Sequence, residues 1–81
     1  MLIVMKVKVL GVECNKCEYL FKFICKIVQE NSLDAKVTQV GDMSEILKYN
    51  VMMTPAVVID GEVKCVGRVP SKAELRAWLG C

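Results

Sequence analysis

The chain has 81 residues, of which 54% are hydrophobic, and its formal net charge is +2. This length is near the lower limit for folding around one hydrophobic core, so we expect a single domain over residues 1–81. Interspersed charges and few aromatic residues argue against a nucleic-acid-binding protein. No apolar run is long enough to cross a membrane, and residues 1–10 lack the features of a signal peptide. We therefore expect a soluble, cytoplasmic protein with no membrane partner.

The first half of the chain predicts two strands, each followed by a helix. Residues 2–9 are apolar apart from two lysines, which is typical of a strand covered on both faces. Apolar residues then recur at helical spacing over residues 15–30. Residues 35–40 predict a second strand, and Asp42, followed three residues later by a glutamate, resembles a capping box that opens a second helix. That helix carries the apolar residues Met43, Ile46 and Leu47.

The second half of the chain predicts a hairpin and a last helix. Residues 56–59 are a β-rich run, and Asp60-Gly61 after it is a strong signal for a two-residue turn into a return strand. Ser71, followed three residues later by a glutamate, is a second capping box, and it opens a helix that Gly80 ends. The element order is therefore βαβαββα. Its first two strands should be parallel, which gives an α/β fold with a four-stranded mixed sheet and helices on both faces.

Cys14-Asn15-Lys16-Cys17 lies between the first predicted strand and the first predicted helix. Two cysteines three residues apart at a helix start lie on one face of the helix, near the separation that a disulfide needs. The unpaired N–H groups and the positive end of the helix dipole favour a thiolate there. Lys16 either favours that thiolate further or is an ordinary solvated lysine. The pattern predicts a reactive dithiol that can close to a disulfide.

Three further cysteines make the total odd, so the five cysteines cannot all pair within one chain. We expect Cys25 and Cys65 to be packing residues. Cys81 is the last residue and could form an intermolecular disulfide on oxidation.

The cysteine pair, Thr54-Pro55 before the hairpin and Gly67 before the last helix together resemble the thioredoxin superfamily. The most similar group is that of the small glutaredoxin-like thioredoxins, of the redox-active disulfide protein 2 type. The resemblance covers essentially the whole chain and implies a thioredoxin-like fold and thiol–disulfide oxidoreductase activity in electron transport and cell redox homeostasis. It implies that Cys14 attacks a substrate disulfide and that Cys17 resolves the mixed disulfide.

The resemblance also implies a substrate-binding wall opposite the two sulfurs. Pro55 would be a cis-proline that faces them, Thr54 would leave its backbone free to pair with an extended substrate, and Gly67 would let the chain pass close to the site. Independently of the resemblance, Met53 and the methionine before it belong either to the core or to an adaptable apolar rim beside the sulfurs, and we favour the rim for one of the two.

The sequence departs from the family pattern at several positions. Asn15 and Lys16 replace the Gly-Pro or Pro-Tyr that family members carry between the cysteines, and we regard both as possible modulators of the dithiol. Residues 66–71 lack the Gly-Gly and Asp of a glutathione site, which argues against glutathione. No acid occurs in residues 2–9, so proton transfer to Cys17 would use water, Glu13 or one of the two strand lysines, Lys6 and Lys8.

These features define the expected partners. The substrates would be proteins that contain disulfides, and the electron donor would be a thioredoxin-reductase-like protein. We expect a monomer that uses no metal and no cofactor beyond the redox-active disulfide Cys14–Cys17.

A metal carrier is the alternative hypothesis. Residues 11–17 also resemble the loop of heavy-metal-associated domains, which have a βαββαβ fold and bind Cu(I) through two thiolates. Val12 replaces the methionine usual in that loop, and the predicted hairpin and terminal helix do not match that fold. The alternative function is therefore a cytosolic carrier of Cu(I) or another soft metal on the same CxxC. A third hypothesis is an interaction domain that keeps the fold without turnover.

Overall fold

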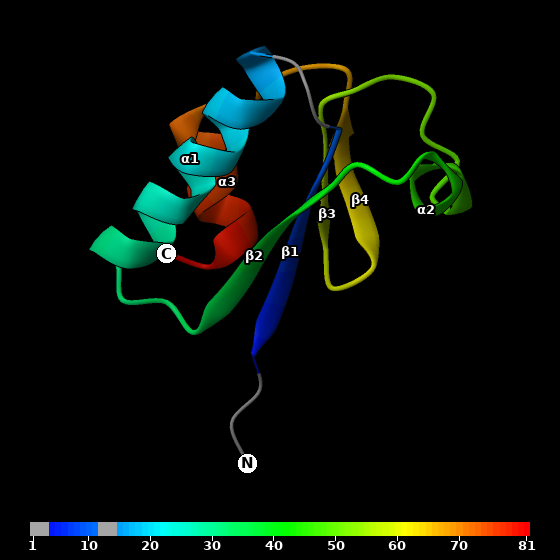
Figure 1. The fold of residues 1–81 in the computed structure, drawn as a ribbon. Coiled ribbons are helices and arrows are strands. Elements are labelled where there is room, and N and C mark those ends of the chain that lie inside the picture. Colours follow the sequence, from blue (N-terminus) through cyan, green and yellow to red (C-terminus); the bar gives the residue numbers. More distant parts are fainter. Residues whose placement is uncertain (1–3, 12–14) are drawn as a thin grey trace.

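The computed structural model describes residues 4–11 and 15–81 (Figure 1). Its elements in chain order are β1 (Met5–Leu10), α1 (Asn15–Glu30), β2 (Ala35–Val40), α2 (Met43–Lys48), β3 (Ala56–Ile59), β4 (Glu62–Val66) and α3 (Lys72–Leu79). This is the predicted βαβαββα order. The predicted first strand, residues 2–9, is wrong at its end by one residue and at Val4, which precedes β1. The prediction for residues 2–3 lies outside the described residues. None of the described helices combines the length and apolarity needed to span a bilayer.

The four strands form one mixed sheet in the order β2-β1-β3-β4. β1 is parallel to β2 and antiparallel to β3, and β3 is antiparallel to β4. Figure 1 shows α1 and α3 together on one side of the sheet and α2 apart from them. The predicted four-stranded mixed sheet with helices on both faces is confirmed.

The core is divided by the sheet into two clusters, because successive side chains of a strand point to opposite faces. In β1, Val7 and Val9 are fully buried in the larger cluster, under α1 and α3. Leu10 belongs instead to the smaller cluster, which includes Ile46 of α2. On α1 the buried residues recur at the helical spacing that the sequence shows, and they are Cys17, Leu20, Ile24 and Ile27. The amphipathic helices α1 and α3 therefore cover one face of the sheet, where the larger core cluster lies.

The hairpin turn is held to the neighbouring strand as well as to its own. Asp60 and Gly61 have φ angles of 50° and 83°, as the predicted two-residue turn requires. The backbone N–H of Asp60 donates to the Lys6 carbonyl at 2.8 Å, and the Lys6 N–H donates to the Asp60 Oδ1 at 2.9 Å. The turn thus fixes how far β3 extends along β1.

The start of α2 differs from the prediction. Asp42 is the N-cap, but its Oδ1 accepts from both the N–H and the hydroxyl of Ser44, at 3.0 and 2.8 Å, and it forms no capping box with Glu45. These hydrogen bonds from Ser44 lower the pKa of Asp42. Serine at the second helical position offers two donors to the same carboxylate, so these two hydrogen bonds take the place of the capping box. Of the apolar residues on α2, only Ile46 is buried, while Met43 and Leu47 are 65% and 57% exposed.

The start of α3 forms the predicted capping box. The Ser71 Oγ accepts from the Glu74 N–H at 3.2 Å, and the Glu74 carboxylate accepts from the Ser71 N–H at 3.1 Å. Arg68 adds two hydrogen bonds to the same carboxylate, at 3.0 and 2.7 Å, and so ties the preceding loop to the helix. Gly80 ends the helix with a φ of 81°, as expected.

This network makes the stability of the fold depend on the ionisation of Glu74. The hydrogen bonds from Arg68, and then that from the Ser71 N–H, lower the pKa of Glu74 from its ordinary 4.5 to about 2. A depressed folded-state pKa contributes stability above pH 4.5, and this contribution is lost as the pH falls through about 2. We expect Glu74→Gln to lower the urea midpoint at pH 7 and to have little effect at pH 2, as measured by unfolding followed by circular dichroism.

Glu62→Gln is the matched control, because Glu62 makes a single ion pair with Lys64 at 3.4 Å. It should change the midpoint less than Glu74→Gln does at pH 7. Equal effects of the two substitutions at pH 7 would contradict the role given to the Glu74 network.

Candidate active site

Gly11 directly follows β1 and lies where the start of α1 and the segment before β3 come together. A Cβ atom on Gly11 would lie 2.8 Å from the Cys17 Sγ and 2.8 Å from the Thr54 Cβ. Real Cβ atoms essentially never approach so closely, and the φ of Gly11 is +115°, a conformation that favours glycine. The absence of a side chain at Gly11 therefore lets the Cys17 sulfur and the Thr54 side chain approach the same point.

Gly11 is held in place by the end of β2. Its N–H donates to the Val40 carbonyl at 2.7 Å, and its own carbonyl accepts from the Gln39 Nε2 at 3.1 Å. The sequence predicted only a turn here. A glycine directly between a strand and a Cys-X-X-Cys pair is the signal that could have identified Gly11 as part of the site.

Cys17 lies on the first turns of α1 and has no exposed surface. It is disulfide-bonded. Its predicted partner, Cys14, lies outside the described residues. Asn15 and Lys16 begin α1 and are exposed, and neither forms an ion pair or a side-chain hydrogen bond with another described residue. Their role as modulators stays a prediction.

The Thr54–Pro55 peptide bond is cis, as predicted. Pro55 is fully buried, whereas Thr54 is exposed beside Gly11. The Pro55 carbonyl accepts from the Gly67 N–H at 2.8 Å, so the segment after β4 is held against the proline. Thr54 thus lies at the same glycine as the Cys17 sulfur, and Gly67 is held to the neighbouring Pro55. The substrate-binding role of these three residues stays a prediction.

Gly67 also makes room for a methionine. A Cβ on Gly67 would lie 3.3 Å from the Met53 Cβ, and the φ of Gly67 is +75°. Met53 is 62% exposed and Met52 is 90% exposed, while Val51 is buried in the smaller core cluster. Both methionines, and not one alone, are therefore available as an apolar rim beside the proline.

The lysines of β1 are not placed to exchange a proton with Cys17. Lys6 and Lys8 alternate with Val7 and Val9, which pack under α1, so the lysine side chains lie on the other face of the sheet. Lys8 Nζ donates to the Tyr49 hydroxyl at 3.2 Å, and this hydrogen bond raises the pKa of Lys8. No charged side chain is buried among residues 4–11 and 15–81. Glu13, also considered from the sequence, lies outside the described residues.

The other cysteines are free thiols away from this junction. Cys65 is buried in the larger core cluster, and its Sγ donates to the Arg68 carbonyl at 3.8 Å. Cys25 is half-buried, and burial raises the pKa of both thiols. A raised pKa disfavours the reactive thiolate, so the prediction that Cys65 is a packing residue is confirmed and Cys25 is also poorly placed to react. Cys81 is exposed.

The fold differs from that of the metal-carrier alternative. The described chain ends with a hairpin and a helix, whereas the βαββαβ fold ends with a strand. Within residues 4–11 and 15–81, histidine, cysteine and acidic side chains form no cluster of three or more that could hold a metal ion. Binding of a soft metal by the cysteine pair stays an untested prediction.

A family model and two known proteins are similar to this chain over most of its length. A family model described as "Thioredoxin domain" matches residues 5–80. A protein named "Thioredoxin" from Methanothermobacter thermautotrophicus is 35% identical over 75 residues, which cover 93% of this chain and 97% of that protein. A "Thioredoxin" from Methanocaldococcus jannaschii is 32% identical over 77 residues, which cover 90% of this chain and 88% of that protein.

The close contact at Gly11 leads to a stability prediction. We expect Gly11→Ala to lower the free energy of unfolding by roughly 2–4 kcal/mol in urea titrations, since the new methyl group adds a steric clash to a strained backbone. Gly61→Ala is the matched control, because Gly61 also has a positive φ but has no atom within 4 Å of its would-be Cβ. The control should cost about 1 kcal/mol. Equal losses in the two variants would show that the contact with Cys17 and Thr54 is unimportant.

Proposed function

The chain belongs to the thioredoxin family, and on that premise we propose that it is a small thiol–disulfide oxidoreductase that exchanges electrons with protein disulfides through a Cys14/Cys17 dithiol. The observation that carries this proposal is the junction at Gly11, where the Cys17 sulfur lies next to Thr54, directly before a cis-proline. Thr54 is exposed, so an extended substrate can approach the site beside this residue.

In the proposed reaction the reduced protein transfers two electrons to its substrate. The Cys14 thiolate attacks one sulfur of the substrate disulfide, whose sulfur–sulfur bond breaks and whose other sulfur leaves and takes up a proton. Cys17 then loses its proton and attacks the Cys14 sulfur. This step forms the Cys14–Cys17 disulfide and releases the second substrate sulfur, which is protonated in turn.

The order of attack follows from the burial of Cys17. Its side chain has no exposed surface, so a protein disulfide in solution cannot reach its sulfur first. A buried thiol at a helix start can still attack a neighbour three residues earlier, because the two side chains share a helix face. Cys17 therefore suits the resolving step, and Cys14 suits the first attack.

Proteins are the proposed substrates because two methionines beside Thr54 are exposed to a docking partner. Met52 and Met53 are exposed next to Thr54, and methionine adapts to varied contact surfaces. Gly67 has no side chain that would crowd Met53 in this rim. A thioredoxin-reductase-like protein is the proposed electron donor, and the missing glutathione pattern disfavours glutathione.

Serine variants of the two cysteines test the scheme. With a protein disulfide such as that of insulin, we expect Cys14→Ser to abolish reduction and to form no mixed disulfide. Cys17→Ser should accumulate the mixed disulfide, detectable by mass spectrometry, since the first attack remains and its resolution is lost. Cys81→Ser is the control and should keep the activity, because Cys81 is exposed at the other end of the chain.

Full activity of Cys14→Ser would refute this scheme. Protein that copurifies with bound Cu(I) and reduces no disulfide would instead support the metal-carrier alternative.

The methionine rim predicts a difference between large and small substrates. We expect Met53→Ser to lower kcat/KM for a protein disulfide by about tenfold, as losing a buried methionine contact should. The rate with a small aromatic disulfide should be unchanged. Met43→Ser is the matched control, because Met43 is 65% exposed, close to the 62% of Met53, but lies on α2. A loss of equal size with both substrates would show that Met53 acts on the cysteines and not on docking.

A further inference from the structure

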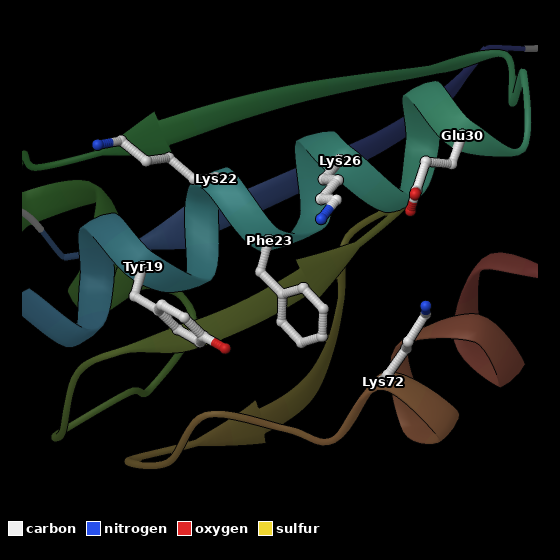
Figure 2. Close-up of a pocket in the computed structure, with 6 residues that line it drawn as sticks. All are labelled: Tyr19, Lys22, Phe23, Lys26, Glu30 and Lys72. Atoms are coloured by element: carbon white, nitrogen blue, oxygen red, sulfur yellow. The ribbon is translucent and has the colours of Figure 1, made fainter.

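A groove of about 320 Å³ opens beside α1, on the side where α3 begins (Figure 2). Its described lining residues include neither Cys17 nor Pro55. We call it the α1–α3 groove, and its lining residues are Tyr19, Lys22, Phe23, Lys26, Glu30 and Lys72. Figure 2 shows that α1 supplies all of them except Lys72, which reaches toward α1 from the start of α3.

Two aromatic rings form the apolar part of the groove. The Tyr19 and Phe23 centroids are 5.7 Å apart and the rings are tilted by 41°. Phe23 packs in part against the larger core cluster, whereas Tyr19 is 60% exposed. A large exposed aromatic side chain with a polar end is typical of a binding surface, since it offers apolar area and a hydrogen bond at once.

The groove carries more positive than negative charge. Three lysines and one glutamate, Glu30, line it, and Figure 2 shows the Lys26 and Lys72 side chains directed into the space between α1 and α3, whereas Lys22 points away from it. The ion pairs among the described residues are Lys64–Glu62 and Arg68–Glu74, so no described acid lies within ion-pair distance of a groove lysine. An anionic ligand can therefore pair with Lys26 and Lys72 without displacing an existing ion pair.

The groove begins near the level of Cys17 along the axis of α1. Tyr19 follows Cys17 by two residues, so it lies about 3 Å further along the helix axis but on a different face. Glu30 ends that helix. At 1.5 Å per residue, Tyr19 to Glu30 spans about 16 Å, the length of about five residues of extended chain. A polypeptide whose disulfide lies at the cysteine pair could therefore continue along the groove.

We infer that the α1–α3 groove binds an acidic, apolar-containing segment of the protein with which this chain exchanges disulfides. An apolar side chain of that segment packs on Tyr19 and Phe23, and its carboxylates pair with the groove lysines. The groove itself follows from the structure alone, while the identity of the partner as a redox partner depends on the proposed function. The groove thereby selects among disulfide proteins by charge.

Binding is tested with a peptide that has no cysteine, so that redox activity is not needed. The probe alternates glutamate and leucine, and its matched peptides carry glutamine or lysine in place of glutamate. Titration followed by amide NMR should shift the signals of Tyr19, Phe23 and Lys72 with the acidic peptide only. Equal shifts with the lysine peptide would overturn the inference. So would shifts that grow with protein concentration alone, which would show that a second copy occupies the groove.

Selection by charge is tested by appending each arm to the same disulfide-containing peptide. We expect the reduced protein to reduce the acidic-arm peptide about tenfold faster than the glutamine-arm peptide, a preference that high salt removes. Combined Lys22→Gln, Lys26→Gln and Lys72→Gln should abolish the preference. Combined Lys6→Gln, Lys36→Gln and Lys48→Gln removes the same charge from exposed lysines outside the groove and should retain it.

The two proposals fail in different ways. If the acidic peptide binds in the groove but no disulfide peptide is reduced, the groove is confirmed and the proposed function is wrong. If both disulfide peptides are reduced equally fast and no groove signal shifts, the proposed function stands and the groove inference is wrong.

Discussion

The arrangement of the site depends on one steric constraint, the lack of room for a side chain at Gly11. A sulfur from α1 and a threonine from the segment before β3 both occupy the space where a Cβ would lie. The Gly11 backbone is also hydrogen-bonded to Val40 and Gln39 of β2, which hold it in place. The absence of a side chain at Gly11 therefore makes the close approach of these two segments possible.

Local sequence signals predicted most of the fold because local forces decide it. The capping box at Ser71 and the Asp60-Gly61 turn satisfy backbone groups within a few residues, so their patterns can be read without tertiary contacts. Asp42 begins the helix as predicted, but the expected capping box with Glu45 is replaced by hydrogen bonds from Ser44, because serine offers two donors close by. Exposure of Met43 and Leu47 was not evident either, because it depends on how much of the sheet a short helix covers.

The candidate site was predicted from motifs and only partly from physics. The cis-proline at Pro55 and the approach of Thr54 to Cys17 could be anticipated because the order of the motifs resembles a known family. The close contact of Gly11, the exclusion of Lys8 and the basic lining of the α1–α3 groove could not. Each of these depends on which face of an element a side chain occupies relative to a distant segment. Such positions are decided by tertiary packing, which local sequence patterns do not reveal.

The two outer strands of the sheet affect whether molecules associate in concentrated solution. β2 and β4 are the edges of the sheet, and open edges can recruit strands from other molecules into aggregates. Lys36 on β2, and Glu62 and Lys64 on β4, place charges along these edges, while the irregular pairing at Val57/Val58 interrupts the ladder beside β4. Charged edges and a local bulge are two recognised protections against such association, so a small, strongly apolar chain can stay dispersed.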